Sequence, residues 1–458
     1  MNVQATARPG TVSSALARDR LGVPAVLAFL LAGVAPLTVA VGLIPAAYAT
    51  TGLRGIPAGF VLVAVILAVF ATGYMAMSRH LRNAGAFYAA MAAARLGIQA
   101  PWWAWALGAW AVVAVLGMAR VEITGKVLGT LTAVEITVIL ALSVSGLAHP
   151  AGGHLSFATL SPGEVTAAGW GTAGVLAVIA VLGCSGFEQA PVLAEEAATP
   201  RRTIPVTTYT ALAVIAVVYG GSAWAMAAHA GTSHVVAAAG AQGPALMFGM
   251  GGAFLSQAGQ WLFLTSLSAA CLAFRNAVIR YEFALGREGV LPGRFGTTSG
   301  NSIPRAASLT QAGTGLVVIG AFALFRWPPV TGLFFGGGTT GGSGILLLLA
   351  FTSVAVIACF RRDARGESAW SRVIAPALAA IVLAGLAVLA VQHYGTLLGV
   401  PASSAATWAL PGAFGALAVS GAGWGLVLRA RRPEVYRTIG LGAHAAAGQP
   451  VPAGRGTR

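Results

Sequence analysis

Two carboxyl groups stand out because they occur within long apolar stretches of the sequence. Glu135 lies twelve residues into the stretch 123–147, and Glu188 follows the small residues that end the stretch 165–187. A carboxyl group at membrane depth is costly and commonly takes part in proton transfer. Both residues are therefore candidates for proton coupling, and a purely structural hydrogen bond is the alternative role for each.

Other reactive residue types show no pattern that indicates chemistry. The cysteines Cys184, Cys271 and Cys359 lie inside or at the end of apolar runs, and the seven histidines lack metal-ligand spacing. The adjacent Glu195 and Glu196 lie in a charged loop, where we expect them to pair with neighbouring arginines at 201–202. We predict neither a disulfide framework, nor a metal site, nor a cofactor, and we do not expect an enzyme.

Two apolar segments are interrupted by small residues and proline. Residues 24–49 contain AGVAP at 32–36, and residues 165–187 contain GCSG at 183–186. Backbone groups that a helix break frees in a bilayer must line a cavity or find partners within the protein. Paired interruptions of this kind indicate a midplane binding site in secondary transporters, although close helix packing also uses small residues.

Composition indicates an all-α, polytopic membrane protein. Of 458 residues, 57% are hydrophobic and only 9% are charged, and the mean hydropathy is +0.81. Alternating strand patterns are absent, and crossing a bilayer as a helix takes about 20 apolar residues. The predicted spans are 24–49, 56–77, 101–118, 123–147, 165–187, 205–228, 253–284, 306–325, 330–358, 372–396 and 407–429.

The net charge of +15 comes from arginines in short loops and tails. The positive-inside rule places such loops in the cytoplasm, where their charges face anionic lipid headgroups rather than nucleic acid. The loops predicted to be cytoplasmic, together with both tails, are 79–95, 120–126, 201–202, 287–305 and 361–372.

This topology lacks one crossing. The loops 79–95 and 120–126 should be separated by two spans, but only 101–118 lies between them. The apolar residues from Gly85 to Gly97 are too few for an ordinary span. We expect an interfacial or re-entrant piece, the alternative being a short helix that spans by thinning the bilayer.

Three charged motifs resemble those of the amino acid-polyamine-organocation (APC) permeases. They are residues 195–205 (EEAATPRRTIP), which follow GFE at 186–188, residues 82–88 (RNAGAFY) and residues 287–292 (REGVLP). They occur in the order expected for that family, and the resemblance covers about residues 21–430. It implies a LeuT-like fold of two inverted five-helix repeats plus two further helices. The family's third helix is expected to be missing between Gly97 and Pro101, which leaves about eleven spans.

The resemblance also implies where a substrate would bind. Backbone amides at the first break suit a carboxylate, and carbonyls freed at the second break suit an ammonium group. The predicted substrate-binding residues are Ala35, Pro36, Leu37, Thr38, Val39, Ala40, Gly183, Cys184, Ser185, Gly186 and Phe187, with Phe187 as the nearest candidate for a gate.

Lys126, the only lysine, adds a third candidate for proton coupling, because some proton-coupled relatives carry a lysine on the fifth helix. Snorkelling from the end of a helix is its ordinary explanation. A polar stripe of Arg275, Asn276 and Arg280 either lines the inward pathway or pairs with Glu282 and phospholipid. The glycine-rich residues 336–344 are expected to be flexible or unwound.

The sequence therefore predicts a cytoplasmic-membrane permease that imports an amino acid by alternating access with proton coupling. Its expected parts are a cytoplasmic tail at 1–20, a permease domain at 21–430 and a disordered cytoplasmic tail at 431–458. A degenerate relative that does not transport and a polyamine or amine permease are the alternatives. The expected partners are a small-molecule substrate and membrane lipid, and the oligomeric state, including a homo-oligomer, stays open.

Overall fold

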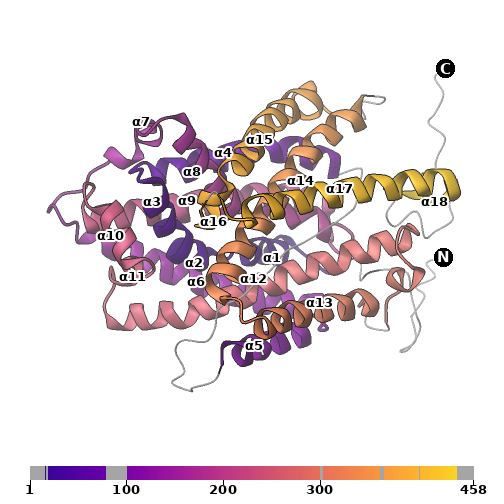
Figure 1. Cartoon of the computed structure of the whole chain (residues 1–458), viewed down its shortest axis with the longest axis horizontal. Coiled ribbons are helices and arrows are strands. Elements are labelled where there is room, and N and C mark those ends of the chain that lie inside the picture. The colour runs from indigo at the N-terminus through magenta and orange to yellow at the C-terminus, as the bar shows by residue number, and fades with distance from the viewer. Residues whose placement is uncertain are drawn as a thin grey trace.

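The computed structural model describes residues 16, 19–78, 101–299, 303–361, 366–401 and 403–440 (Figure 1). Within these ranges the chain forms helices and no strand, and an isolated bridge pairs Leu21 with Ala197. The all-α class is therefore confirmed.

The α-helices are α1 (Val23–Val34), α2 (Pro36–Thr38), α3 (Ile44–Thr51), α4 (Ile56–Ser78), α5 (Trp102–Leu116), α6 (Val121–Ala148), α7 (Pro162–Val165), α8 (Trp170–Cys184), α9 (Pro200–Ala230), α10 (Val235–Gln242), α11 (Ala245–Phe248), α12 (Ala253–Arg287), α13 (Arg305–Leu324), α14 (Gly337–Phe360), α15 (Ala375–Gln392), α16 (Tyr394–Leu398), α17 (Ala406–Arg431) and α18 (Pro433–Thr438). The π-helices are η1 (Val39–Leu43), η5 (Pro329–Gly336) and η6 (Trp370–Ile374). The 3-10 helices are η2 (Ala158–Leu160), η3 (Phe187–Leu193) and η4 (Gly293–Gly296).

Ten helical segments of the described ranges are long and apolar enough to cross a membrane, which makes the protein a polytopic membrane protein. They correspond to ten of the eleven predicted spans. The eleventh, predicted at 101–118, is α5, whose 15 residues fall short of the usual length. The predicted loss of a family helix before Pro101 falls on residues 79–100, which lie outside the described ranges.

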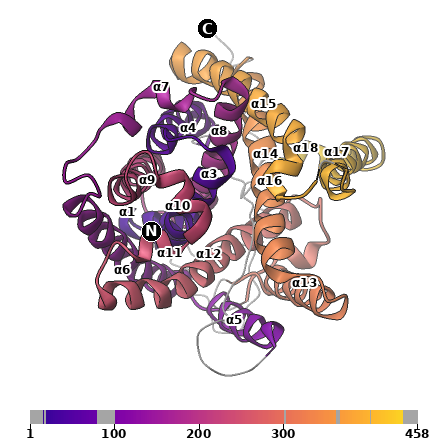
Figure 2. The same cartoon turned by 60° about the vertical axis from the view of Figure 1, so that its left-hand side comes forward.

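Helix α1 and its continuation lie at the centre of the bundle. Of the 18 most apolar consecutive residues in the segment Val23–Thr51, 83% are buried. They are buried because α6, α9 and α12 pack around this segment, and α4 packs on α9. Figure 2 shows α5 beside α13 at one edge and α17 at another. In α17, none of the 18 most apolar consecutive residues is buried. The interrupted first segment is thus the most enclosed span, and α17 is peripheral.

The glycine-rich run is helical, so the expectation of an unwound stretch is wrong. Residues up to Gly336 belong to η5, and α14 begins at Gly337. Two of its glycines allow close packing: a β-carbon on Gly342 would lie 2.5 Å from Leu182 Cγ, and one on Gly344 would lie 2.8 Å from Phe414 Cε1. Membrane helices use glycine in this way, and lipid penalises an unwound backbone.

Two boundaries in the structure differ from the predicted ones. The segment predicted from residue 165 starts as a membrane helix only at Trp170, after a turn in which Gly169 has φ of 90°. The tail predicted to be disordered from residue 431 begins with α18, which packs on the end of α12. Thr438 Oγ1 donates a hydrogen bond to the Glu288 carbonyl at 3.0 Å. Residues 441–458 lie outside the described ranges.

Candidate functional site

The first break is a single residue. Helix α1 ends at Val34, Ala35 adopts a left-handed conformation (φ 51°, ψ 65°), and a helix resumes at Pro36. Proline disfavours the helical region for the residue before it and has no N–H to continue the hydrogen-bond ladder. The Val34 carbonyl accepts a hydrogen bond from Tyr219 Oη at 3.1 Å. The sequence therefore locates this break correctly, but every residue from 36 to 40 is helical.

The second break spans two residues. Helix α8 runs through Gly183 and ends at Cys184, Ser185 is extended, and Gly186 has φ of 128°, which favours glycine. Glu188 Oε2 accepts a hydrogen bond from the Gly186 amide at 2.6 Å. Among the described residues, the carbonyls of Cys184 and Ser185 accept no hydrogen bond. Within the described ranges, the second break therefore leaves two carbonyls without a hydrogen-bond donor.

The two breaks are in direct contact. A β-carbon on Gly186 would lie 2.6 Å from the Val34 amide nitrogen, and one on Gly33 would lie 2.5 Å from Gln189 Nε2. Leu37 and Phe187 are fully buried, and the Phe187 ring packs edge-on to Phe70 at 6.1 Å between centroids. Protein therefore closes over both breaks in this conformation.

Glu135 reaches the first break from α6. Its carboxyl group lies near the Leu37 backbone and the Ser266 hydroxyl, and the residue is 1% exposed. Helices α2, α6 and α12 pack on one another and carry four buried oxygens without a hydrogen-bond partner among the described residues: Glu135 Oε1, Ser266 Oγ, Thr38 Oγ1 and Thr132 Oγ1. Buried polar atoms are rarely left unpaired, so this cluster is suited to a proton, water or polar ligand.

Glu188 is held at the second break. Its Oε2 accepts a hydrogen bond from the Gly186 amide. Its other carboxyl oxygen, Oε1, is buried without a partner among the described residues. The Glu188 carbonyl accepts a hydrogen bond from Tyr74 Oη at 3.1 Å. Gln189 Nε2, also buried, has no acceptor within the described ranges. Considering only the described residues, each break thus has one carboxyl group with an unpaired oxygen.

Lys126 lies away from this site. Its side chain is exposed, whereas Glu135 on the same helix is buried. The two are nine residues apart, which at 3.6 residues per turn places them on opposite faces of α6. The geometry therefore favours snorkelling over proton coupling for Lys126.

The charged residues beyond the breaks form ion pairs with partners other than those predicted from the sequence. Arg280 Nε contacts Glu196 Oε2 at 2.5 Å, and Arg287 binds Glu195 through two hydrogen bonds. Arg275 Nη2 donates to Ser308 Oγ at 2.7 Å. These pairs join α12 to the segment after the second break and to α13, instead of joining glutamates to nearby arginines.

Several residues of the site were not predicted from the sequence. Thr132 could have been found, because it precedes Glu135 by three residues on one helix face, and Gln189 could have been found beside the break. Ser266 and Tyr219 come from α12 and α9, far along the chain, and no local pattern marks them.

Comparison with known proteins identifies the family of the chain. A family model described as amino acid permease matches residues 45–414. The match includes α6 and the second break, and it begins after the first break. No curated protein matches the chain.

Proposed function

Since the chain belongs to the amino acid permease family, we propose that it imports an amino acid across the cytoplasmic membrane by alternating access, coupled to protons. The family is one of transporters, so the protein is not an enzyme. Both termini are cytoplasmic in this proposal, as the arginine-rich loops indicate. Protein closes over the two breaks here, so transport requires movement of the helix halves around them.

The observation that carries proton coupling is the position of Glu135 beside the Leu37 backbone. The start of the resumed helix is where a substrate carboxylate would find amides and a favourable dipole. An ionised Glu135 repels that carboxylate and competes for the same amides, whereas a protonated Glu135 does neither. Proton uptake and substrate binding therefore favour each other, and substrate and proton move together.

The second break supplies the other end of the site. Within the described ranges the carbonyls of Cys184 and Ser185 accept no hydrogen bond, so they can accept one from an ammonium group. Glu188 is tied to the Gly186 amide, which fixes the geometry of the break. A zwitterionic amino acid would thus place its carboxylate toward α2 and its ammonium group toward the end of α8.

Uptake into proteoliposomes tests this proposal. The purified full chain is reconstituted and given a mixture of labelled amino acids, with and without an inward proton gradient. Gradient-dependent accumulation of at least one amino acid is the expected result. Monodisperse, folded protein that accumulates none under either condition would overturn the proposal and leave a non-transporting relative as the better description.

One observation favours a second candidate, an amine permease. Glu135 and Glu188 place a carboxyl group at each break, and within the described ranges neither makes an ion pair with a basic side chain. Two separated carboxylates suit the two ammonium groups of a diamine. A labelled linear diamine belongs in the same assay, and accumulation of the diamine without any amino acid would select this alternative.

A further inference from the structure

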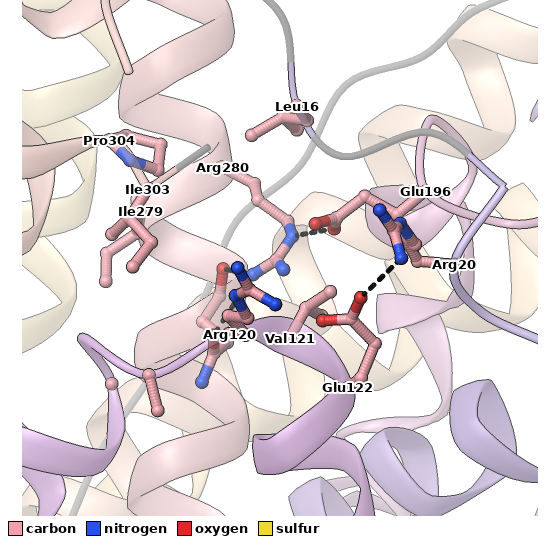
Figure 3. A pocket seen from close by; sticks show the side chains of 13 residues that line it. Leu16, Arg20, Arg120, Val121, Glu122, Glu196, Ile279, Arg280, Ile303 and Pro304 are labelled. Carbon is pink, nitrogen blue, oxygen red and sulfur yellow. Dashed lines mark hydrogen bonds and ion pairs between the residues drawn. The ribbon is translucent and has the colours of Figure 1, made fainter. Parts of the chain in front are cut away.

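A polar cavity of about 150 Å³ lies where the N-terminal segment meets α6 and α12 (Figure 3). It is separate from the two breaks. Its charged lining consists of Arg20, Arg120, Glu122, Glu196 and Arg280, drawn together from several parts of the chain. A cavity of this volume can hold several water molecules or a small anion.

The charges in this cavity do not balance. Arg20 pairs with Glu122 at 3.5 Å, and Arg280 pairs with Glu196. Arg120 makes no ion pair with any residue of the described ranges. Within these ranges, three guanidinium groups therefore face two carboxylates, and Arg120 carries the uncompensated positive charge. Figure 3 shows its side chain directed toward Arg280 across the cavity.

Arg280 cannot move to relieve this imbalance. Its Nη1 donates to the Asn276 carbonyl at 2.7 Å and to Asn276 Oδ1 at 3.2 Å, and its Nε donates to Glu196. The residue is 7% exposed, so its guanidinium is a fixed charge largely shielded from solvent. A guanidinium held in this way attracts an anion more strongly than a solvated one.

The start of α6 adds backbone donors. This 28-residue helix begins at Val121, its cap residue is Arg120, and no side chain caps it. Val121 and Glu122, at the first two helical positions, both line the cavity. Uncapped amides at the start of a long helix carry partial positive charge and bind oxyanions.

We propose that this cavity is a binding site for a phosphate group, held by Arg120 with help from Arg20 and the first amides of α6. The group comes either from free phosphate or from the headgroup of an anionic phospholipid. Glu122 competes with the anion for Arg20. Occupation of the cavity therefore loosens the N-terminal segment from α6. The site is independent of substrate and does not rest on the proposed transport activity.

Thermal unfolding of the purified full chain in zwitterionic lipid nanodiscs tests the site. Inorganic phosphate should raise the Tm in a saturable manner, and potassium chloride of equal ionic strength should not. R120Q should weaken the apparent phosphate affinity by about tenfold, the loss expected for one charged hydrogen bond. R54Q is the matched control, since Arg54 is exposed in the loop between α3 and α4, and its affinity should match that of the original chain.

E122Q gives a second, independent readout. Removal of the competing carboxylate should tighten phosphate binding, a gain that structural damage does not produce. Equal effects of chloride and phosphate would overturn the proposal, as would equal phosphate affinities for R120Q and R54Q. Weaker binding by E122Q would do the same.

Nanodiscs with anionic phospholipid distinguish the two sources of the group. If the lipid headgroup fills the cavity, added phosphate raises the Tm in zwitterionic discs but not in anionic ones. If free phosphate is the ligand, its effect is the same in both. Either result requires that, in zwitterionic discs, R120Q need about tenfold more phosphate than the original chain for the same rise in Tm.

Discussion

The α-carbon of Gly186 packs against the backbone of Val34, so the second break rests directly on the end of α1. A β-carbon at Gly186 would lie 2.6 Å from the Val34 nitrogen, closer than any real contact allows. The φ of 128° at Gly186 is also one that other residues rarely adopt. Two independent constraints thus require glycine at this point of contact.

Gly186→Ala should therefore destabilise the protein by about 1–3 kcal/mol through strain and overpacking. The measurement is the Tm of the purified chain. Gly221→Ala is the control, because Gly221 lies inside α9 and a β-carbon added there would have nothing within 4 Å. Equal Tm values for the two variants would show that the breaks are not packed as described.

Glu135→Gln keeps the size of the side chain but cannot ionise. If Glu135 carries the coupled proton, uptake by the original chain rises as the external pH falls, by at most about tenfold per pH unit for one proton. The variant resembles the protonated form at every pH, so its uptake should not depend on pH. Glu434→Gln, on exposed α18, should behave like the original chain. An unchanged pH profile for Glu135→Gln would assign the proton to another group.

Lys126→Gln should leave both the rate of uptake and its pH dependence unchanged, since the side chain points away from the breaks. The same proteoliposome assay measures this. Loss of pH dependence in this variant would show that Lys126 reaches the site in another conformation.

Arg280→Met should cost about 3–5 kcal/mol, because it leaves the Glu196 carboxylate buried without its partner. The double variant Arg280→Met with Glu196→Leu removes both charges and should recover much of that loss. Chemical denaturation in detergent measures the difference. Arg429→Met, on exposed α17, controls for loss of an arginine. A double variant less stable than the single one would contradict the pairing.

Trp110 anchors the short helix α5 to α13, because its Nε1 donates to the Ala312 carbonyl at 2.9 Å. Trp110→Phe should lower stability by about 0.5–1.5 kcal/mol for the lost hydrogen bond. Trp103→Phe on the exposed face of α5 should have little effect. Equal Tm values for these two variants would mean that α5 is not held by this contact.

Length and apolarity were sufficient to predict ten of the eleven spans, because a bilayer fixes how long a membrane helix must be. The breaks were also predictable, since Pro36 and Gly186 act on the local backbone. The partners of the glutamates were not, because Arg280 and Arg287 reach Glu196 and Glu195 across the bundle rather than along the chain.

The polar cluster around Glu135 was predictable only in part. Glu135 itself is conspicuous in an apolar stretch, but Ser266 joins it from α12 through packing that no local pattern encodes. The error over the glycine-rich run has the opposite cause. In water, glycine lowers helix propensity. In lipid, the backbone must satisfy its hydrogen bonds within the helix, and glycine allows helices to pack closely.

The bridge between Leu21 and Ala197 extends the contact between the two breaks to the end of the bundle. The amides of Arg20 and Leu21 donate to the Glu196 carbonyl at 2.8 and 2.9 Å, and the Ala198 amide donates to the Leu21 carbonyl at 3.0 Å. Helix α1 and the segment after Gly186 are thus fastened together at both ends. A displacement of the N-terminal segment would therefore be transmitted through both of them to the two breaks.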